Sequence, residues 1–101
     1  MGSRLELQTT LEMLLGSRNV YFQPPESIKM KYPAIVYKRD DIGNVYASNG
    51  VYAQKFLYEL TYIDEDPDND MIIRLSKLPY CDFVRAYSFD GLNHYTFTLY
   101  Y

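Results

Sequence analysis

Residues 52–62 read YAQKFLYELTY, a stretch in which the even-numbered positions are mostly large and apolar. Side chains of a β-strand point alternately to its two faces, so this period of two predicts one long strand. One face of the strand would be aromatic, and the opposite face would carry Lys55, Glu59 and Thr61. The stretch therefore predicts a sheet whose apolar face is covered by other elements.

Two shorter β-prone runs precede this stretch. Residues 20–22 end at the pair Pro24-Pro25, and residues 33–39 open with a proline, which a sheet tolerates at the first position of a strand. The proline pair is expected to protect an edge strand from indiscriminate pairing. Residues 40–50 are polar and contain two pairs of turn-forming residues, so they are expected to form a long hairpin loop.

Two segments predict helices. Leucines share one helical face in residues 4–15, and Gly16 supplies a left-handed stop. Residues 67–78 are expected to form the second helix, with Asp66 as its N-cap and Pro67 as its first residue. The positive end of the helix dipole would stabilise the acidic residues in its first turn. The apolar faces comprise Leu7, Leu11, Leu14 and Leu15 in the first helix and Met71, Ile72, Leu75 and Leu78 in the second.

Two closing runs, residues 81–89 and 94–101, alternate again around Asp90-Gly91, which is a strong hairpin signal. The predicted order is α-β-β-β-α-β-β within a single domain of residues 1–101. Most neighbouring strands are joined by connections too short for a crossover helix. This favours an α+β fold with a mainly antiparallel sheet and two helices packed on one face. A chain of 101 residues can bury one core without metal or disulfide staples.

Net charge, cysteine content and the lengths of apolar runs limit the functions and locations that we expect for this protein. The net charge of −3 does not attract phosphate backbones, so duplex DNA binding is not expected. Cys81, the single cysteine, lies in a strand-like run where an inert buried thiol is usual, and a reducing compartment fits. No apolar run reaches the roughly 18 residues of a membrane span, and the first residues lack the apolar core of a signal peptide. We expect a cytoplasmic origin, no membrane partner and no cofactor.

Candidates for catalysis are few. His94, the single histidine, follows Asp90 by four residues across a turn, so a general acid–base pair is conceivable. Ser88 and Cys81 are the nearest nucleophile types, but no Gly-x-Ser-x-Gly elbow or glycine-rich loop positions them. The sequence therefore predicts that the protein is not an enzyme.

The acidic stretch 64–70 imitates the first half of a calcium loop. Asn69 stands where that loop needs its glycine, Leu75 stands where it needs its bidentate glutamate, and Pro67 interrupts the start. Capping of the second helix explains these acids better, so no metal site is predicted.

The 12 tyrosines suit a protein interface, because a tyrosine ring gives a large contact area at low entropy cost. They could instead stack on single-stranded bases, although the basic residues Lys38, Arg39, Lys55 and Arg85 are scattered and do not interleave with them. A partner protein or self-association is favoured. The alternative is a small peptide- or single-stranded nucleic-acid-binding module that uses a tyrosine-rich sheet face.

Three stretches also carry a family resemblance: LLGSRNVYFQPPESIKMKYPAIVYKRDD (14–41), YELTYIDEDPDND (58–70) and LNHYTFTLYY (92–101). They resemble the small tail-completion proteins of long-tailed bacteriophages and prophages of Gram-positive hosts. These proteins are of the tail-terminator or tail-to-head joining type and are often labelled minor capsid proteins. The resemblance extends over residues 11–101 and rests on a linear pattern of strands and turns.

The resemblance implies a structural α+β virion subunit that forms an oligomeric ring, typically a hexamer, on the end of the tail tube. Such a ring stops tube growth and offers a surface to the head connector at the head–tail junction. The implied partners are the tail-tube protein, head-connector proteins and further copies of the chain, and a monomer in solution is compatible with this role. Assembly would take place in the host cytoplasm, and DNA would pass through the ring without being specifically bound.

The resemblance further implies that the extended loop after the second strand contacts neighbouring subunits. A ring subunit must present two different complementary patches to its neighbours, and the charges at residues 38–41 can set the register between them. Carried over to the matching positions of this sequence, the interface comprises Lys38, Arg39, Asp40, Asp41, Asn44 and Tyr46.

Overall fold

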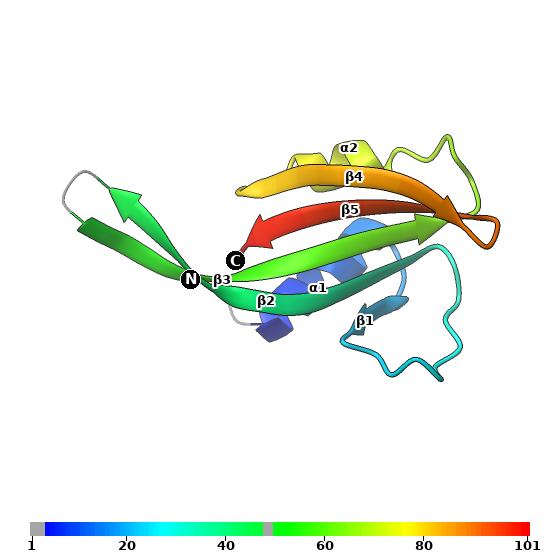
Figure 1. Ribbon diagram of the computed structural model, residues 1–101, viewed down its shortest axis with the longest axis horizontal. Coiled ribbons are helices and arrows are strands. Elements are labelled where there is room, and N and C mark those ends of the chain that lie inside the picture. Colours follow the sequence, from blue (N-terminus) through cyan, green and yellow to red (C-terminus); the bar gives the residue numbers. More distant parts are fainter. Residues whose placement is uncertain (1–3, 48–49) are drawn as a thin grey trace.

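Within the described residues, five strands form one sheet in the order β1-β2-β3-β5-β4 (Figure 1). The computed structural model describes the backbone of residues 4–47 and 50–101 and the side chains of residues 4–40 and 56–101. The order of the elements confirms the predicted α+β class. In chain order they are α1 (Arg4–Leu15), β1 (Val20–Phe22), β2 (Ala34–Ala47), β3 (Gly50–Asp64), α2 (Met71–Ser76), β4 (Cys81–Phe89) and β5 (Leu92–Tyr100).

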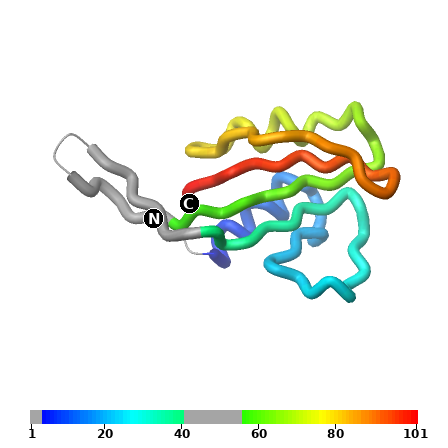
Figure 2. The backbone as a smooth tube through the Cα atoms, in the orientation of Figure 1, coloured from blue at the N-terminus to red at the C-terminus, as the bar shows by residue number. Residues whose placement is uncertain are grey.

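Neighbouring strands of the sheet are antiparallel except for β1, which runs parallel to β2. Figure 2 traces how β5, in red, returns between β3 and β4. The last residue of the chain also pairs with β3, because Tyr101 and Phe56 exchange backbone hydrogen bonds of 3.0 and 3.2 Å. One edge of the sheet is therefore β1, as expected for the strand before the proline pair, and the other edge is β4.

The core lies on one face of the sheet. Tyr58, Leu60 and Tyr62 of β3 are buried there, which confirms the apolar face predicted from the period of two. Leu60 lies opposite Phe97 of β5, and Tyr58 lies opposite Leu99. Both helices cover this face, because their buried side chains belong to the same cluster. These helical side chains are Leu7 and Leu11 of α1 and Met71 and Leu75 of α2.

The first helix has the bounds that its leucine pattern predicts. Gly16 follows it with φ of +78°, and its N–H donates to the Glu12 carbonyl at 2.9 Å. This is the left-handed closure expected of a glycine after a helix.

The second helix is shorter than predicted, spanning Met71–Ser76 and not residues 67–78. Asp66 does not cap it, because its carboxylate accepts the backbone N–H two residues later at 2.9 Å. Asn69 then accepts the N–H of Met71 through its side-chain oxygen at 2.7 Å. Such short-range bonds from side chain to backbone compete with helix formation and hold the preceding residues in turns.

The prediction of a hairpin loop over residues 40–50 is wrong, because β2 and β3 continue through most of this segment. Gly43 and Asn44, which locally favour a turn, are paired with β3. Cross-strand pairing along a long hairpin outweighs the local preference of single residues, since strand formation depends strongly on its neighbours. Residues 48–49, which include part of the predicted Asn-Gly turn, lie outside the described residues.

The hairpin between β4 and β5 forms where predicted. Asp90 and Gly91 have φ of 55° and 74°, the positive values that a two-residue type I′ turn requires. Within β4, the pairing with β5 shifts between Phe83 and Arg85, which marks a β-bulge.

Candidate interface site

An aromatic row crosses β1, β2 and β3 beside the predicted interface. The row consists of Phe22, Tyr37, Tyr58 and Phe56, whose successive ring centroids lie 5.0, 5.9 and 6.5 Å apart. Aromatic pairs in tilted or edge-on contact contribute about 0.5–1.5 kcal/mol beyond the burial of their surface. The aromatic row therefore gives this part of the sheet a fixed arrangement of side chains.

An arginine covers each end of the aromatic row. The guanidinium of Arg39 lies 4.1 Å from the ring centroid of Phe56 and 5.6 Å from that of Tyr58. It also donates a hydrogen bond of 3.2 Å to the Tyr58 hydroxyl. Arg4 lies 4.7 Å from the centroid of Phe22 at the other end. Each such cation–π contact contributes about 0.5–1 kcal/mol at exposed sites, so Arg39 is held against β3.

A β-bulge sets Asp40 apart from its neighbours. The pairing of β2 with β3 shifts between Arg39 and Asp41, which leaves Asp40 as the extra residue. The backbone N–H of Arg39 donates to the Gln23 side chain at 3.2 Å, which ties the bulge to the segment after β1. Bulges commonly re-aim a side chain. Asp40 accordingly presents an exposed carboxylate on a backbone that is held from two sides.

The structure describes three of the six predicted interface side chains. Lys38, Arg39 and Asp40 follow one another on β2 and are exposed. The Lys38 Nζ atom lies 4.0 Å from the Glu59 Oε2 atom, a surface ion pair of small energetic weight. The side chains of the other three lie outside the described residues, and their place in an interface stays a prediction. These three are Asp41, Asn44 and Tyr46, whose backbone belongs to β2.

Sequence reasoning missed the residues that support this site. The contact of Arg39 with Phe56 and Tyr58 depends on the register of β2 against β3 across the bulge. The sequence indicated an aromatic face for residues 52–62, but no local pattern gives the cross-strand register. Gln23 was also missed, since it carries no recognisable motif.

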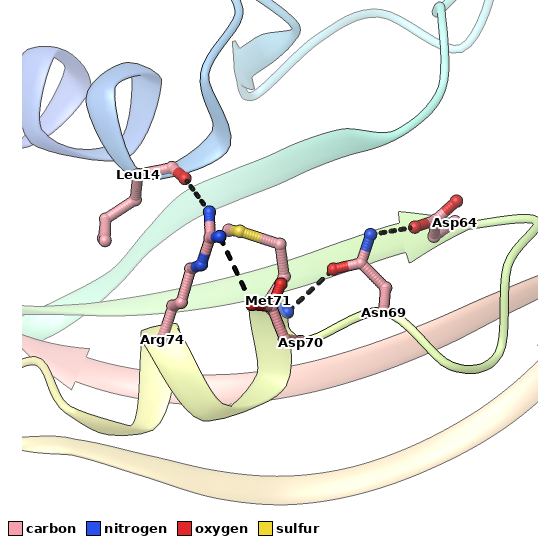
Figure 3. Close-up of polar contacts among 6 residues, drawn as sticks. All are labelled: Leu14, Asp64, Asn69, Asp70, Met71 and Arg74. Atoms are coloured by element: carbon pink, nitrogen blue, oxygen red, sulfur yellow. Dashed lines mark hydrogen bonds and ion pairs between the residues drawn. The ribbon is translucent and has the colours of Figure 1, made fainter.

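A second polar cluster surrounds Asp64 at the C-terminal end of β3, and Figure 3 shows its contact with Asn69. The buried Asp64 carboxylate accepts hydrogen bonds from the Tyr62 hydroxyl at 2.5 Å, the Asn69 amide at 2.8 Å and the Asp66 N–H at 3.1 Å. Burial, together with this carboxylate, raises the pKa of Tyr62 well above its ordinary value. The Asp64 cluster orders the connection between β3 and α2.

Asp70, another acid of this connection, also has a structural partner. The Asp70 carboxylate lies 3.2 Å from the Arg74 guanidinium, which also donates to the Leu14 carbonyl at 3.4 Å (Figure 3). The pair thereby links α2 to the end of α1. Within the part of the chain that the structure describes, no group of three His, Cys, Asp or Glu residues is placed to hold a metal ion.

His94 packs as an aromatic ring. It stacks on Tyr87 with centroids 4.8 Å apart, and Phe89 contacts it edge-on at 6.5 Å. Its Nδ1 atom lies 3.1 Å from the Leu92 carbonyl oxygen. Within the part of the chain that the structure describes, His94 forms no hydrogen bond or ion pair with Asp90, which belongs to the adjacent turn. This arrangement does not assemble an acid–base pair.

Cys81 is one of the two candidate nucleophiles named from the sequence. Burial, with a smaller contribution from Asp82, raises the pKa of the Cys81 thiol to about 11, so the thiolate is scarce at neutral pH. An apolar cavity of about 120 Å³ lies between α1 and the ends of α2 and β5, and its lining includes Leu7, Leu78 and Leu99.

The chain matches no protein-family model, no curated protein and no solved structure. Across the described residues, no helix has the length and apolar character needed to cross a membrane.

Proposed function

We propose that the chain is a structural subunit of a bacteriophage virion, of the tail-terminator or tail-to-head joining type. It assembles into a ring on the end of the tail tube at the head–tail junction and stops the tube from growing. The opposite side of the ring meets the head connector. The role requires no cofactor and no catalysis.

The observation that carries the proposal is the exposed charge at the Asp40 bulge. Ring subunits must repeat one contact at a fixed rotation, and charged groups on a rigid support can set that rotation. Arg39 supplies this support, because its side chain is held by the aromatic row and its backbone is held by Gln23. The order of helices and strands also agrees with the α+β subunit that the family resemblance implies.

The net charge of the chain suits a ring around DNA. A charge of −3 repels the phosphate backbone, so DNA can slide through without being retained. The specific partners in this role are the tail-tube protein, the connector and further copies of the chain.

The peptide- or nucleic-acid-binding alternative requires an exposed tyrosine face. Tyr58 and Tyr62 of β3 instead lie beneath the helices, at most 1% exposed. The exposed tyrosines Tyr32, Tyr80 and Tyr87 lie in three separate segments of the described chain. This distribution favours the structural role. A single-stranded oligonucleotide that bound the protein, with an affinity that fell steeply as salt rose, would support the alternative.

Co-sedimentation with assembled tail tubes tests the proposal. The tubes are made from the tail-tube protein of the same phage or prophage. The folded protein is expected to pellet with the tubes, and Asp40→Lys is expected to lower the affinity about tenfold or more, which corresponds to about 1.4 kcal/mol. Asp68→Lys makes the same charge change in the connection before α2 and should bind like the original protein.

Two outcomes would contradict the proposal. The folded protein would remain in the supernatant at every tube concentration, or both lysine variants would lose binding equally. The second result would point to a general charge effect and not to a contact at the bulge.

A further inference from the structure

The β4 strand is a long, open edge of the sheet. It has nine residues, and every residue from Asp82 to Phe89 is exposed. Its apolar side chains include Phe83 at 50%, Val84 at 46% and Phe89 at 70% exposure. An exposed apolar edge strand is a template for pairing with another strand, because its outward backbone groups have no partner within the sheet. This surface is not used by the proposed contact at Asp40.

The opposite edge of the sheet does not match β4. The β1 strand has only three residues, and Gln23 follows it with φ of 44° before the proline pair. Prolines cannot donate backbone hydrogen bonds to a neighbouring strand. Addition of β4 to the β1 edge of another copy would therefore form few hydrogen bonds, so the sheets are poorly suited to joining head to tail through these edges.

Two β4 residues of opposite charge, Asp82 and Arg85, are paired with residues of β5 that lie two positions apart. Asp82 is paired with Thr98 of β5, and Arg85 is paired with Thr96. Because Thr96 and Thr98 are two residues apart on one strand, both charges lie on the same face of the sheet. Phe83, on the core side, packs edge-on against Phe97 with centroids 5.5 Å apart, so the charges lie on the face that the helices leave open.

We propose that β4 pairs with β4 of a second copy, antiparallel about a two-fold axis between Phe83 and Val84. In this register, Asp82 of each copy lies opposite Arg85 of the other, and Phe83 and Val84 of the two copies meet at the axis. An apolar centre is thus flanked by two ion pairs. A register that places Asp82 opposite Asp82, or Arg85 opposite Arg85, brings like charges together, which is unfavourable for directly opposite residues.

Bulges and charges on an edge strand usually discourage indiscriminate pairing. On β4 the charges of Asp82 and Arg85 discourage a strand of unrelated sequence but are complementary to those of a second β4, so they select one partner and one register. The two sheets join into one, with the helices of both copies on the same side. Because the contact is isologous, it closes as a dimer and leaves no second β4 edge for growth. This inference does not rest on the proposed tail role.

Charge reversal at the two positions tests the dimer. Asp82→Arg places two arginines opposite each other at both ends of the contact, and Arg85→Asp places two carboxylates opposite each other there. Sedimentation velocity over about a hundredfold dilution series measures the dimer. Each variant alone is expected to weaken dimerisation at least tenfold. An equimolar mixture of the two variants is expected to recover it, because each copy then carries the charges that the other lacks.

The controls separate this contact from folding and from general charge effects. Glu26→Arg makes the same charge change as Asp82→Arg at an exposed position before β2 and should dimerise normally. Circular dichroism should show that both β4 variants are folded, since the two side chains are exposed. The proposal is overturned if the original protein is monomeric throughout the series, if either variant alone dimerises normally, or if the mixture of the variants fails to recover the dimer.

Discussion

At the scale of single residues, Asp64 and Tyr62 form a buried polar pair at the end of β3. Asp64 accepts three hydrogen bonds, and one of them comes from the buried Tyr62 hydroxyl. The sequence predicted that the acids of residues 64–70 cap the second helix and do not form a calcium site. It did not indicate which acid is central, because that depends on the burial of the end of β3.

The Tyr62 hydroxyl makes a pH-dependent contribution to stability. Its pKa in the folded protein is raised above the ordinary value of 10.0, mainly by burial and then by the hydrogen bond to Asp64. Above pH 10 the unfolded chain releases this proton while the folded chain keeps it. The free energy of unfolding contributed by Tyr62 is therefore fully present below pH 10 and falls as pH rises further.

Tyr62→Phe tests this linkage. The variant loses a hydrogen bond to a charged group, so it should be less stable at neutral pH by about 1.5–3 kcal/mol. The difference from the original protein should narrow above pH 10, as measured by urea unfolding at several pH values. Tyr32→Phe alters an exposed tyrosine and should change the free energy of unfolding by no more than about 0.5 kcal/mol. A difference that widened above pH 10 would contradict this account of Tyr62.

At the scale of elements, the two helices show what local sequence can and cannot predict. The bounds of α1 were predictable because its leucine period and Gly16 both act within a few residues. The start of α2 was not, because the side chains of Asp66 and Asn69 bind nearby backbone groups and replace the expected cap. Helix ends therefore follow the local pattern only where no side chain competes for the backbone.

The left-handed residue after α1 gives a direct test of its predicted end. A Cβ atom at Gly16 would have no heavy atom within 4 Å, so a substitution there changes only the backbone energy. Gly16→Ala should destabilise the protein by about 1–2 kcal/mol. Gly16→Asn should cost less, because asparagine tolerates this conformation better. Urea unfolding measures both, and equal losses would show that the left-handed backbone is not the cause.

The β2–β3 hairpin shows the limit of prediction for the candidate site. Gly43 and Asn44 favour a turn when they are considered alone, but their pairing with β3 depends on the residues of the opposite strand. The charged residues at 38–40 were predicted as interface residues from the sequence and the family resemblance. Their support by the aromatic row could not be predicted, since it requires the cross-strand register and the bulge.

At the scale of the whole molecule, the two proposed contacts use different parts of the sheet. The bulge at Asp40 lies on β2, near the β1 edge, and the proposed dimer uses the β4 edge. A single chain can therefore carry one contact for the ring on the tail and another for the β4 dimer. Charge reversal at each site should affect its own assembly and leave the other unchanged, because no described residue belongs to both contacts.

The elongation of tail tubes tests the central claim most directly. Tubes of the tail-tube protein from the same phage or prophage are grown with and without this chain, and their lengths and ends are measured by negative-stain electron microscopy. The account predicts that the chain stops elongation and forms ring-shaped density at one end of each tube, whereas Asp40→Lys at the same concentration stops fewer tubes. Tubes that lengthen at the same rate in an excess of the folded protein, with bare ends, would contradict it.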